Sequence, residues 1–155
     1  MSATPATKLL DKLRIDYRLH EYAYDPTAQN IGMQAADALG VDPARLFKCL
    51  MFGTSAQTGA ALIPTNKEMN LKLAAKALNE KKISLLDKSK AEKLSGYVIG
   101  GISPLGQRSR CQVLLDQTAL LHETILFNGG KRGLQIEIAP QDFTRAANAK
   151  TLELT

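Results

Sequence analysis

Cysteine and histidine are scarce in this sequence, with two of each among 155 residues. Cys49 and Cys111 are too few and too far apart for a disulfide framework or a zinc site, which requires closely spaced ligand pairs. His20 and His122 form neither an HExxH motif nor any other paired-ligand spacing. We therefore expect reduced thiols and no metal site.

Long hydrophobic runs are also missing. No apolar stretch approaches the ~20 residues needed to cross a bilayer, and the opening MSATPATKLLDKLRI lacks the uninterrupted apolar segment of a signal peptide. These absences predict a cytoplasmic protein without a membrane partner. Hydrophobic residues make up 45% and charged residues 23%, as in globular domains, and the length predicts one domain over residues 1–155.

The common nucleotide-binding and nucleophile motifs are absent. No GxGxxG fingerprint follows the first expected strand. Gly129-Gly130-Lys131 lacks the Walker spacing and precedes a strand rather than a helix. Ser103 lies outside any GxSxG elbow, and no base for it can be identified. The sequence therefore predicts no side-chain catalytic triad.

Positive charge is in excess, with 20 Lys and Arg against 15 Asp and Glu. A net charge of +5 favours polyanionic partners, although many basic proteins bind no nucleic acid. Aromatic residues amount to 5% with no tryptophan, which limits base stacking to Tyr22 or Tyr24. The cations that could contact phosphates, or could equally form a solvated surface, are Lys8, Lys12, Arg14, Arg108, Arg110, Lys131 and Arg132.

Hydrophobic periodicity predicts an α/β (α+β) chain in which strands and helices mix. Helices are expected from Thr4-Pro5, before Gly40, over 70–78 and 87–94, and from Pro140. Short strands are expected at 15–20, 46–52, 60–63, 83–86, 96–99, 112–115, 124–127 and 134–138. We predict a mixed, barrel-like sheet of about seven strands surrounded by helices.

Lys48 interrupts the apolar run LFKCLMF, which otherwise has the pattern of a buried strand. An unpaired ammonium is costly to bury. Either the Lys48 side chain reaches water from a strand end or edge, or its amine faces a pocket that receives an anionic or strongly polar group.

Two glycine-rich segments could form turns or bind ligands. In YVIGGISPLG, Gly100 and Gly101 allow positive φ or close ligand approach, and Pro104 fixes the exit direction. Such a loop could present amide donors to an oxyanion or could simply be a turn. The segment Asn128–Gly133 reads equally well as a hairpin loop and as an anion-binding turn.

Together these segments resemble the YbaK/EbsC branch of the prolyl-tRNA synthetase editing-domain family. The resemblance covers nearly the whole chain, through TPATKLLDKLRIDYRLHEYAYDP, LFKCLMFG, GYVIGGISPLGQ and GGKRGLQIEIAP. It implies a free-standing aminoacyl-tRNA deacylase, closest to those that remove cysteine mischarged onto proline tRNA, with Cys-tRNA(Cys) as a further substrate. It also implies the barrel-like fold, and no metal or organic cofactor.

The resemblance also implies a set of site residues. Lys48 matches the hallmark functional lysine, and Gly100 and Gly101 are assigned with it to the catalytic machinery. Substrate-binding positions are Tyr22, Ile102, Ser103, Pro104, Asn128, Gly129, Gly130 and Gln135. Lys131 and Arg132 are expected to contact tRNA weakly. Asn128 and Gln135 depart from close relatives, which carry Ser and Asp there, and Gln135 cannot act as a carboxylate.

Two alternatives to cysteine removal stay open. One is removal of alanine from proline tRNA on the same fold, because hydrophobic pockets discriminate small groups poorly. The other is a noncatalytic module that binds tRNA or a synthetase. We expect a monomer, with the acceptor end of tRNA(Pro) as its partner and with prolyl-tRNA synthetase as a further one.

Overall fold

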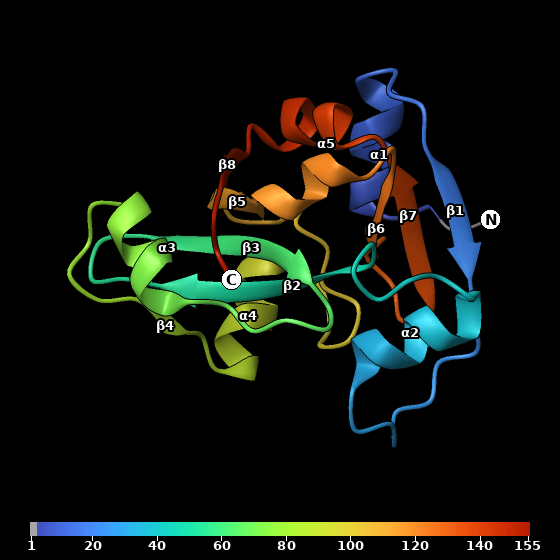
Figure 1. The fold of residues 1–155 in the computed structure, drawn as a ribbon, viewed down its shortest axis with the longest axis horizontal. Coiled ribbons are helices and arrows are strands. Elements are labelled where there is room, and N and C mark those ends of the chain that lie inside the picture. Colours follow the sequence, from blue (N-terminus) through green and yellow to red (C-terminus); the bar gives the residue numbers. More distant parts are fainter. Residues whose placement is uncertain (1–2) are drawn as a thin grey trace.

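The computed structural model describes residues 3–155, which form five α-helices, a short 3-10 helix and eight strands (Figure 1). The helices are α1 (Pro5–Lys12), α2 (Ile31–Leu39), α3 (Leu71–Ala77), α4 (Lys88–Ser95), α5 (Pro140–Ala147) and the 3-10 helix η1 (Gln117–Leu121). The strands are β1 (Arg18–Glu21), β2 (Phe47–Gly53), β3 (Thr58–Pro64), β4 (Ser84–Leu85), β5 (Gln112–Asp116), β6 (Ile125–Asn128), β7 (Leu134–Ile138) and β8 (Lys150–Leu152).

The strands form two sheets. The smaller is antiparallel in the order β1-β7-β6, and the larger is mixed in the order β4-β2-β3-β5-β8. Strands β3, β5 and β8 run parallel, while β2 pairs antiparallel with β3 over its whole length. A single parallel bridge between Leu46 and Leu126 joins the sheets, so β6 lies beside the beginning of β2.

Helix ends follow their local chemistry. The Thr4 hydroxyl accepts a hydrogen bond from the Thr7 amide and Pro5 occupies the first turn, as the sequence predicts for the start of α1. Helix α2 ends at Gly40, whose φ of 65° is left-handed. These caps satisfy main-chain groups that would otherwise lack partners at the helix ends.

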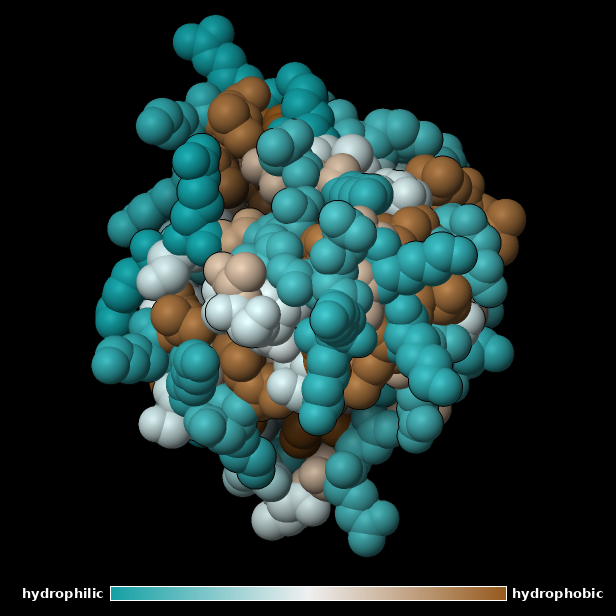
Figure 2. Space-filling view, turned by 90° about the vertical axis from the view of Figure 1, so that its left-hand side faces the viewer, coloured by the Kyte–Doolittle hydropathy of each residue, from teal (hydrophilic) through white to brown (hydrophobic). Residues whose placement is uncertain are grey.

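Helices cover the two sheets at different places. The antiparallel sheet and α5 meet where the rings of Phe127 and Phe143 pack edge to face with centroids 5.0 Å apart. On the larger sheet, Phe52 and Ile63 pack with Ala74 of α3. In Figure 1, α5 lies at the top end of the antiparallel sheet and α2 at its bottom end, near the beginning of β2. The end of the molecule that carries α3 and β4 presents mainly hydrophilic side chains, with hydrophobic residues between them (Figure 2).

Three details of the predicted fold are wrong. The sheet does not close into a barrel, because the chain forms two sheets. Residues 96–99 form no strand: Gly96 ends α4 with a φ of 81°, and the Ile99 amide donates to the Glu92 carboxylate instead of to a neighbouring strand. Strand β8 was not predicted, since its apolar pattern is only three residues long.

The remaining predicted strands and all five helices are confirmed, with shifted ends. No helix within residues 3–155 is long and apolar enough to span a membrane. The single-domain organisation of residues 1–155 stays a prediction.

Candidate functional site

A cavity of about 210 Å³ lies where the beginning of β2, the beginning of α2 and the loop before β5 meet. Six of the residues that the sequence predicts for the site line it together: Tyr22, Lys48, Gly100, Ile102, Asn128 and Gln135. They come from five separate segments of the chain, so only the folded protein assembles this cavity. Its size suits a small amino-acid group better than a drug-sized ligand, which requires about 300–1,000 Å³.

Lys48 lies in β2 opposite Ile63 of β3, and its side chain lines the cavity. Its amine makes no hydrogen bond or ion pair with any residue in the described range 3–155. Burial lowers the pKa of Lys48 below its ordinary value, and the Glu68 carboxylate partly opposes this shift. Of the two readings of Lys48, the structure supports an amine that faces a pocket.

Two polar atoms of the cavity also lack partners. The Tyr22 hydroxyl and the Gln135 side-chain oxygen are buried and make no hydrogen bond within the described chain. Burial raises the pKa of Tyr22, while the Gln135 side chain beside it acts in the opposite direction. Buried polar groups are normally hydrogen-bonded, so these two mark places where a ligand would supply the missing partners.

The GGISP loop is held as a turn that leaves some amides free. Gly100 has a φ of 87°, which favours glycine, and the Gly101 amide donates to the Val98 carbonyl at 2.8 Å. The amides of Gly100, Ile102 and Ser103 make no hydrogen bond to residues 3–155. Gly100 and Ile102 line the cavity and Ser103 does not. An oxyanion site in this loop would therefore use the amides of Gly100 and Ile102, and the Gly101 amide is not available to it.

The turn at Asn128–Gly133 packs directly on this loop. Asn128 donates from its side-chain nitrogen to the Gly100 carbonyl at 3.0 Å, and its side-chain oxygen accepts from the amides of Gly130 and Lys131. Arg132 donates to the Ile99 carbonyl at 2.8 Å, and its guanidinium lies over the Tyr24 ring. The two glycine-rich segments thus form one unit.

The other predicted site residues lie outside the cavity lining. Ser103 is fully buried and its hydroxyl oxygen accepts from the Leu105 amide at 3.3 Å. Gly129 accepts the Thr4 hydroxyl at its carbonyl, and Gly130 has a φ of 101° that the turn requires. Pro104 lines a different groove. Lys131 and Arg132 are both exposed, and Arg132 uses its Nε to donate to the Ile99 carbonyl, so their contact with tRNA stays a prediction.

Sequence reasoning missed six of the residues that line the cavity. Ile31 and Gly32 come from the beginning of α2, Leu46, Phe47 and Cys49 from the beginning of β2, and Ile99 from the loop before β5. Gly32 lies against the Thr65 hydroxyl, which is also buried without a partner, so closely that a Cβ at position 32 would overlap it. An earlier start of the helix at the Asn30 cap could have been read from the sequence, but the packing against Thr65 could not.

No protein nucleophile is apparent at the cavity. Burial raises the pKa of the Cys49 thiol, and the neighbouring Cys111 raises it further, so Cys49 stays neutral and unreactive at physiological pH. Within residues 3–155 no group of three or more His, Cys, Asp or Glu side chains could hold a metal ion. The arrangement offers a cation, free amides and unpartnered polar atoms, which bind and polarise a small polar ligand.

Comparison with known proteins gives a consistent result. Residues 25–146 match the family described as aminoacyl-tRNA editing domain. A protein of Enterococcus faecalis, EbsC, whose name proposes it as a Cys-tRNA(Pro)/Cys-tRNA(Cys) deacylase, is 32% identical over 156 residues, which cover 98% of this chain and 93% of that protein.

Two solved structures share the fold. One, described as a proposed trans-editing enzyme for prolyl tRNA synthetase, has a TM-score of 0.84 at 18% identity and covers 100% of this chain and 99% of its own. The other, described as hypothetical protein APE2540, has a TM-score of 0.85 at 20% identity and covers 97% of this chain and 99% of its own. With the cavity built around Lys48 and the family match over most of the chain, the protein belongs to the aminoacyl-tRNA editing domain family.

Proposed function

We propose that this protein removes cysteine from mischarged tRNA(Pro), and also accepts Cys-tRNA(Cys). As a member of the editing family it is an aminoacyl-tRNA deacylase, and the proposal concerns the amino acid and the route. The observation that carries it is the unpartnered amine of Lys48 in a cavity of about 210 Å³. A cavity of this size accommodates a small aminoacyl group such as cysteinyl.

The route is assisted by the substrate. The cysteine sulfur attacks its own ester carbonyl carbon, the bond from that carbon to the ribose oxygen breaks, and the thiol proton ends on the ribose hydroxyl. Cysteine leaves as a cyclic thiolactone, which water then opens. This route is supported by the absence of any activated nucleophile around the cavity, where burial keeps the Cys49 thiol neutral.

Lys48 and the loop would share the remaining work. The Lys48 ammonium positions the ester or the terminal nucleotide by donating to an oxygen. The free amides of Gly100 and Ile102 stabilise the negative charge that develops on the carbonyl oxygen. The Gln135 oxygen, which is buried and lacks a partner, accepts a hydrogen bond from the substrate ammonium.

Deacylation of tRNA(Pro) charged with cysteine, serine or alanine tests the proposal. Cysteine should be released much faster than serine, which is nearly the same size and a weaker nucleophile. Equal rates for the two would rule out the thiol route, and faster release of alanine would make the protein an Ala-tRNA(Pro) deacylase. Binding without turnover of any of the three would leave a noncatalytic module and refute the proposal.

The proposal extends to the setting of the enzyme. We propose a cytoplasmic location, because translation supplies charged tRNA there. A monomer would be sufficient, since the cavity is lined by one chain. Prolyl-tRNA synthetase is the partner that would deliver mischarged tRNA(Pro).

A further inference from the structure

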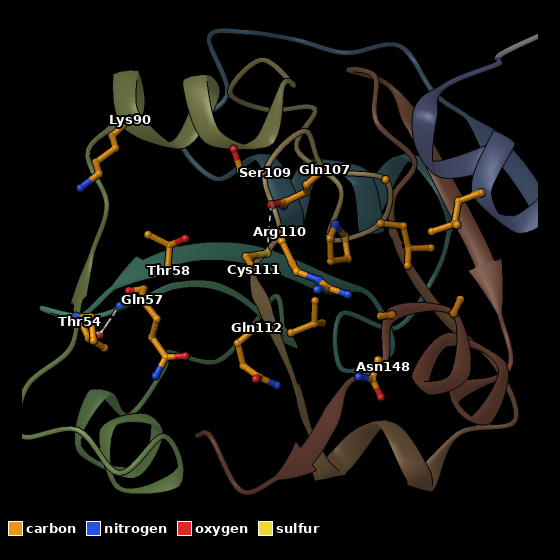
Figure 3. A pocket seen from close by; sticks show the side chains of 18 of the residues that line it. Thr54, Gln57, Thr58, Lys90, Gln107, Ser109, Arg110, Cys111, Gln112 and Asn148 are labelled. Atoms are coloured by element: carbon orange, nitrogen blue, oxygen red, sulfur yellow. Dashed lines mark hydrogen bonds between the residues drawn. The ribbon is translucent and has the colours of Figure 1, made fainter.

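A second, larger groove lies beyond the loop that forms one wall of the candidate site. Its volume is about 1010 Å³, and it lies where β2 ends and where β3 and β5 begin. Figure 3 shows its side chains arranged around the beginning of β5, with Lys90 of α4 at one side and Asn148, which follows α5, at the other. Neither the family match nor the proposed deacylation uses this groove.

The charged side chains that line this groove are all positive. Among the residues that line it, Lys90 and Arg110 are cations and none is Asp or Glu. Both cations are exposed, and neither side chain makes an ion pair or hydrogen bond within the described part of the chain. The nearby Glu80 carboxylate accepts hydrogen bonds from Thr54 and Gln57 at the rim and does not line the groove. The charged groups on the lining itself are therefore positive, and the Glu80 carboxylate lies behind the rim at Thr54 and Gln57.

The rest of the lining is rich in hydrogen-bonding groups. Hydroxyl and amide side chains come from the β2–β3 hairpin, from the loop before β5 and from the end of α5: Thr54, Ser55, Gln57, Thr58, Gln107, Ser109, Gln112 and Asn148. Such side chains, with Arg and Lys, are the groups that contact phosphate and sugar in nucleic-acid complexes. Figure 3 shows the Arg110 side chain extending across the middle of the groove.

We propose that this groove binds the sugar-phosphate backbone of the tRNA, outside the aminoacyl end. The proposal rests on tRNA being the substrate, as the proposed function has it. A wide trough with two unpaired cations and no carboxylate suits a polyanionic strand. A protein partner would instead favour aromatic residues at the centre, and this lining contains none, although it includes aliphatic residues such as Leu9 and Val113.

The groove is also connected to the candidate site. Gln107 lines it and donates to the Ser103 carbonyl at 2.9 Å, while its side-chain oxygen accepts from the Cys111 thiol. Ser103 directly follows Ile102, which lines the cavity and has a free amide. RNA bound along the groove would therefore contact the segment that holds the proposed oxyanion donors.

The test is the double variant Lys90→Glu/Arg110→Glu, with Lys90→Gln/Arg110→Gln as a milder form. The matched control is Arg18→Glu/Lys76→Glu, which makes the same charge change at two exposed positions outside both the groove and the cavity. Binding of uncharged tRNA(Pro) is measured by fluorescence anisotropy across a salt series. Turnover is measured on Cys-tRNA(Pro) and on cysteinyl-adenosine, which lacks the tRNA body.

We expect the groove variant to bind tRNA at least tenfold more weakly than the control. Its plot of log affinity against log salt should be shallower by about 1.5, since each lost phosphate contact removes roughly 0.7–0.9. KM for Cys-tRNA(Pro) should rise, and turnover of cysteinyl-adenosine should not change. The Gln form should show a smaller loss of the same kind.

Three results would overturn the proposal. They are tRNA binding equal to that of the control, an equal loss on cysteinyl-adenosine, and a loss of binding to prolyl-tRNA synthetase with tRNA binding intact. Failure of the proposed function would look different, because wild-type protein would then release no amino acid while the anisotropy comparison still reported on the groove. Unchanged melting temperatures would show that the variants fold.

Discussion

The side-chain nitrogen of Asn128 donates a hydrogen bond to the carbonyl oxygen of Gly100 at 3.0 Å. This contact joins the turn after β6 to the loop that forms a wall of the cavity, across 28 residues of sequence. In this chain Asn128 therefore fixes the loop from outside the reacting groups.

Asn128→Asp should isolate that contact. Its carboxylate can still accept from the amides of Gly130 and Lys131, but it has no donor for the Gly100 carbonyl. We expect kcat for Cys-tRNA(Pro) to fall about tenfold with little change in KM, as loss of preorganisation requires. Asn128→Ala, which loses the acceptor too, should also lower the melting temperature. Wild-type kcat in both variants would remove Asn128 from this role.

Substitution of Gly101 should reduce deacylation more than substitution of Ser103, although only Ser103 carries a side-chain hydroxyl. A Cβ at position 101 would lie 2.9 Å from the Arg132 amide nitrogen and 3.1 Å from the Lys131 carbonyl carbon, which are main-chain atoms that cannot yield easily. The Ser103 hydroxyl only accepts one long hydrogen bond inside its turn. We expect Gly101→Ala to reduce deacylation more than tenfold and Ser103→Ala less than threefold. The reverse order would make the Ser103 hydroxyl a chemical participant.

Substitution of Lys48 should lower the deacylation activity without lowering the stability of the fold. Because its amine is partly buried without a partner, Lys48→Met removes a desolvation cost and should leave the free energy of unfolding unchanged or higher at pH 7. Deacylation should fall by orders of magnitude if the amine positions the ester. Chemical denaturation and single-turnover rates measure the two effects. A destabilised Lys48→Met that kept its activity would contradict both the burial argument and the assigned role.

The lowered pKa of Lys48 also gives a pH dependence. The unfolded chain holds the lysine proton up to its ordinary pKa of 10.5 and the folded chain releases it earlier. Between the lowered pKa and 10.5 the unfolded state therefore binds more protons, and stability rises with pH. The ratio of the wild-type rate to that of Lys48→Arg should fall over the same window, because guanidinium keeps its charge. A flat ratio would show that the charge on Lys48 is not used.

Glu137 should contribute to the stability of the fold and not to catalysis. Its carboxylate accepts from the Thr124 hydroxyl and the Arg45 guanidinium, both at 2.6 Å, and lies 2.7 Å from the His20 ring nitrogen. The pKa of Glu137 is lowered most by the hydrogen bond from Thr124, and further by His20 and Arg45. This stability is present above the ordinary pKa of 4.5 and is lost as pH falls through the lowered value.

Glu137→Gln should therefore cost about 1–3 kcal/mol at pH 7, and the difference from wild type should shrink below pH 4.5. Urea unfolding at pH 7 and at pH 3 measures it. Glu153→Gln, at an exposed position, is the control. Deacylation at pH 7 should match wild type in both variants, and a selective loss in Glu137→Gln would connect this network to the site.

Local patterns predicted the parts of the fold that depend on local chemistry. The caps at Thr4 and Gly40 and the run that contains Lys48 all lie where side-chain spacing places them. The strand predicted at 96–99 does not form, because an apolar run is equally compatible with a strand and with a packed turn. There, the Glu92 carboxylate takes the Ile99 amide. Such a contact depends on how α4 meets the loop, and no periodicity encodes it.

The candidate site divides in the same way. Lys48 and the two glycine-rich segments stood out because each violates the pattern around it. Tyr22 and Gln135 were assigned to the site from the family resemblance and not from their spacing in the sequence. Neither the sequence patterns nor the family resemblance predicted that Gly32 packs against Thr65, because this contact depends on how a helix fits on the end of a strand.

The break between the two sheets has a consequence for how this scaffold could be altered. Along one edge of β2, Leu46 bridges to β6 and Phe52 pairs with β4, while no strand in residues 3–155 pairs with Lys48–Leu50 on that edge. The cavity occupies the interruption. A redesign that lengthened β6 to complete the barrel would add main-chain hydrogen bonds and remove an exposed edge. It would also fill the place where the substrate is proposed to enter, so a more stable version of this protein made in that way should be an inactive one.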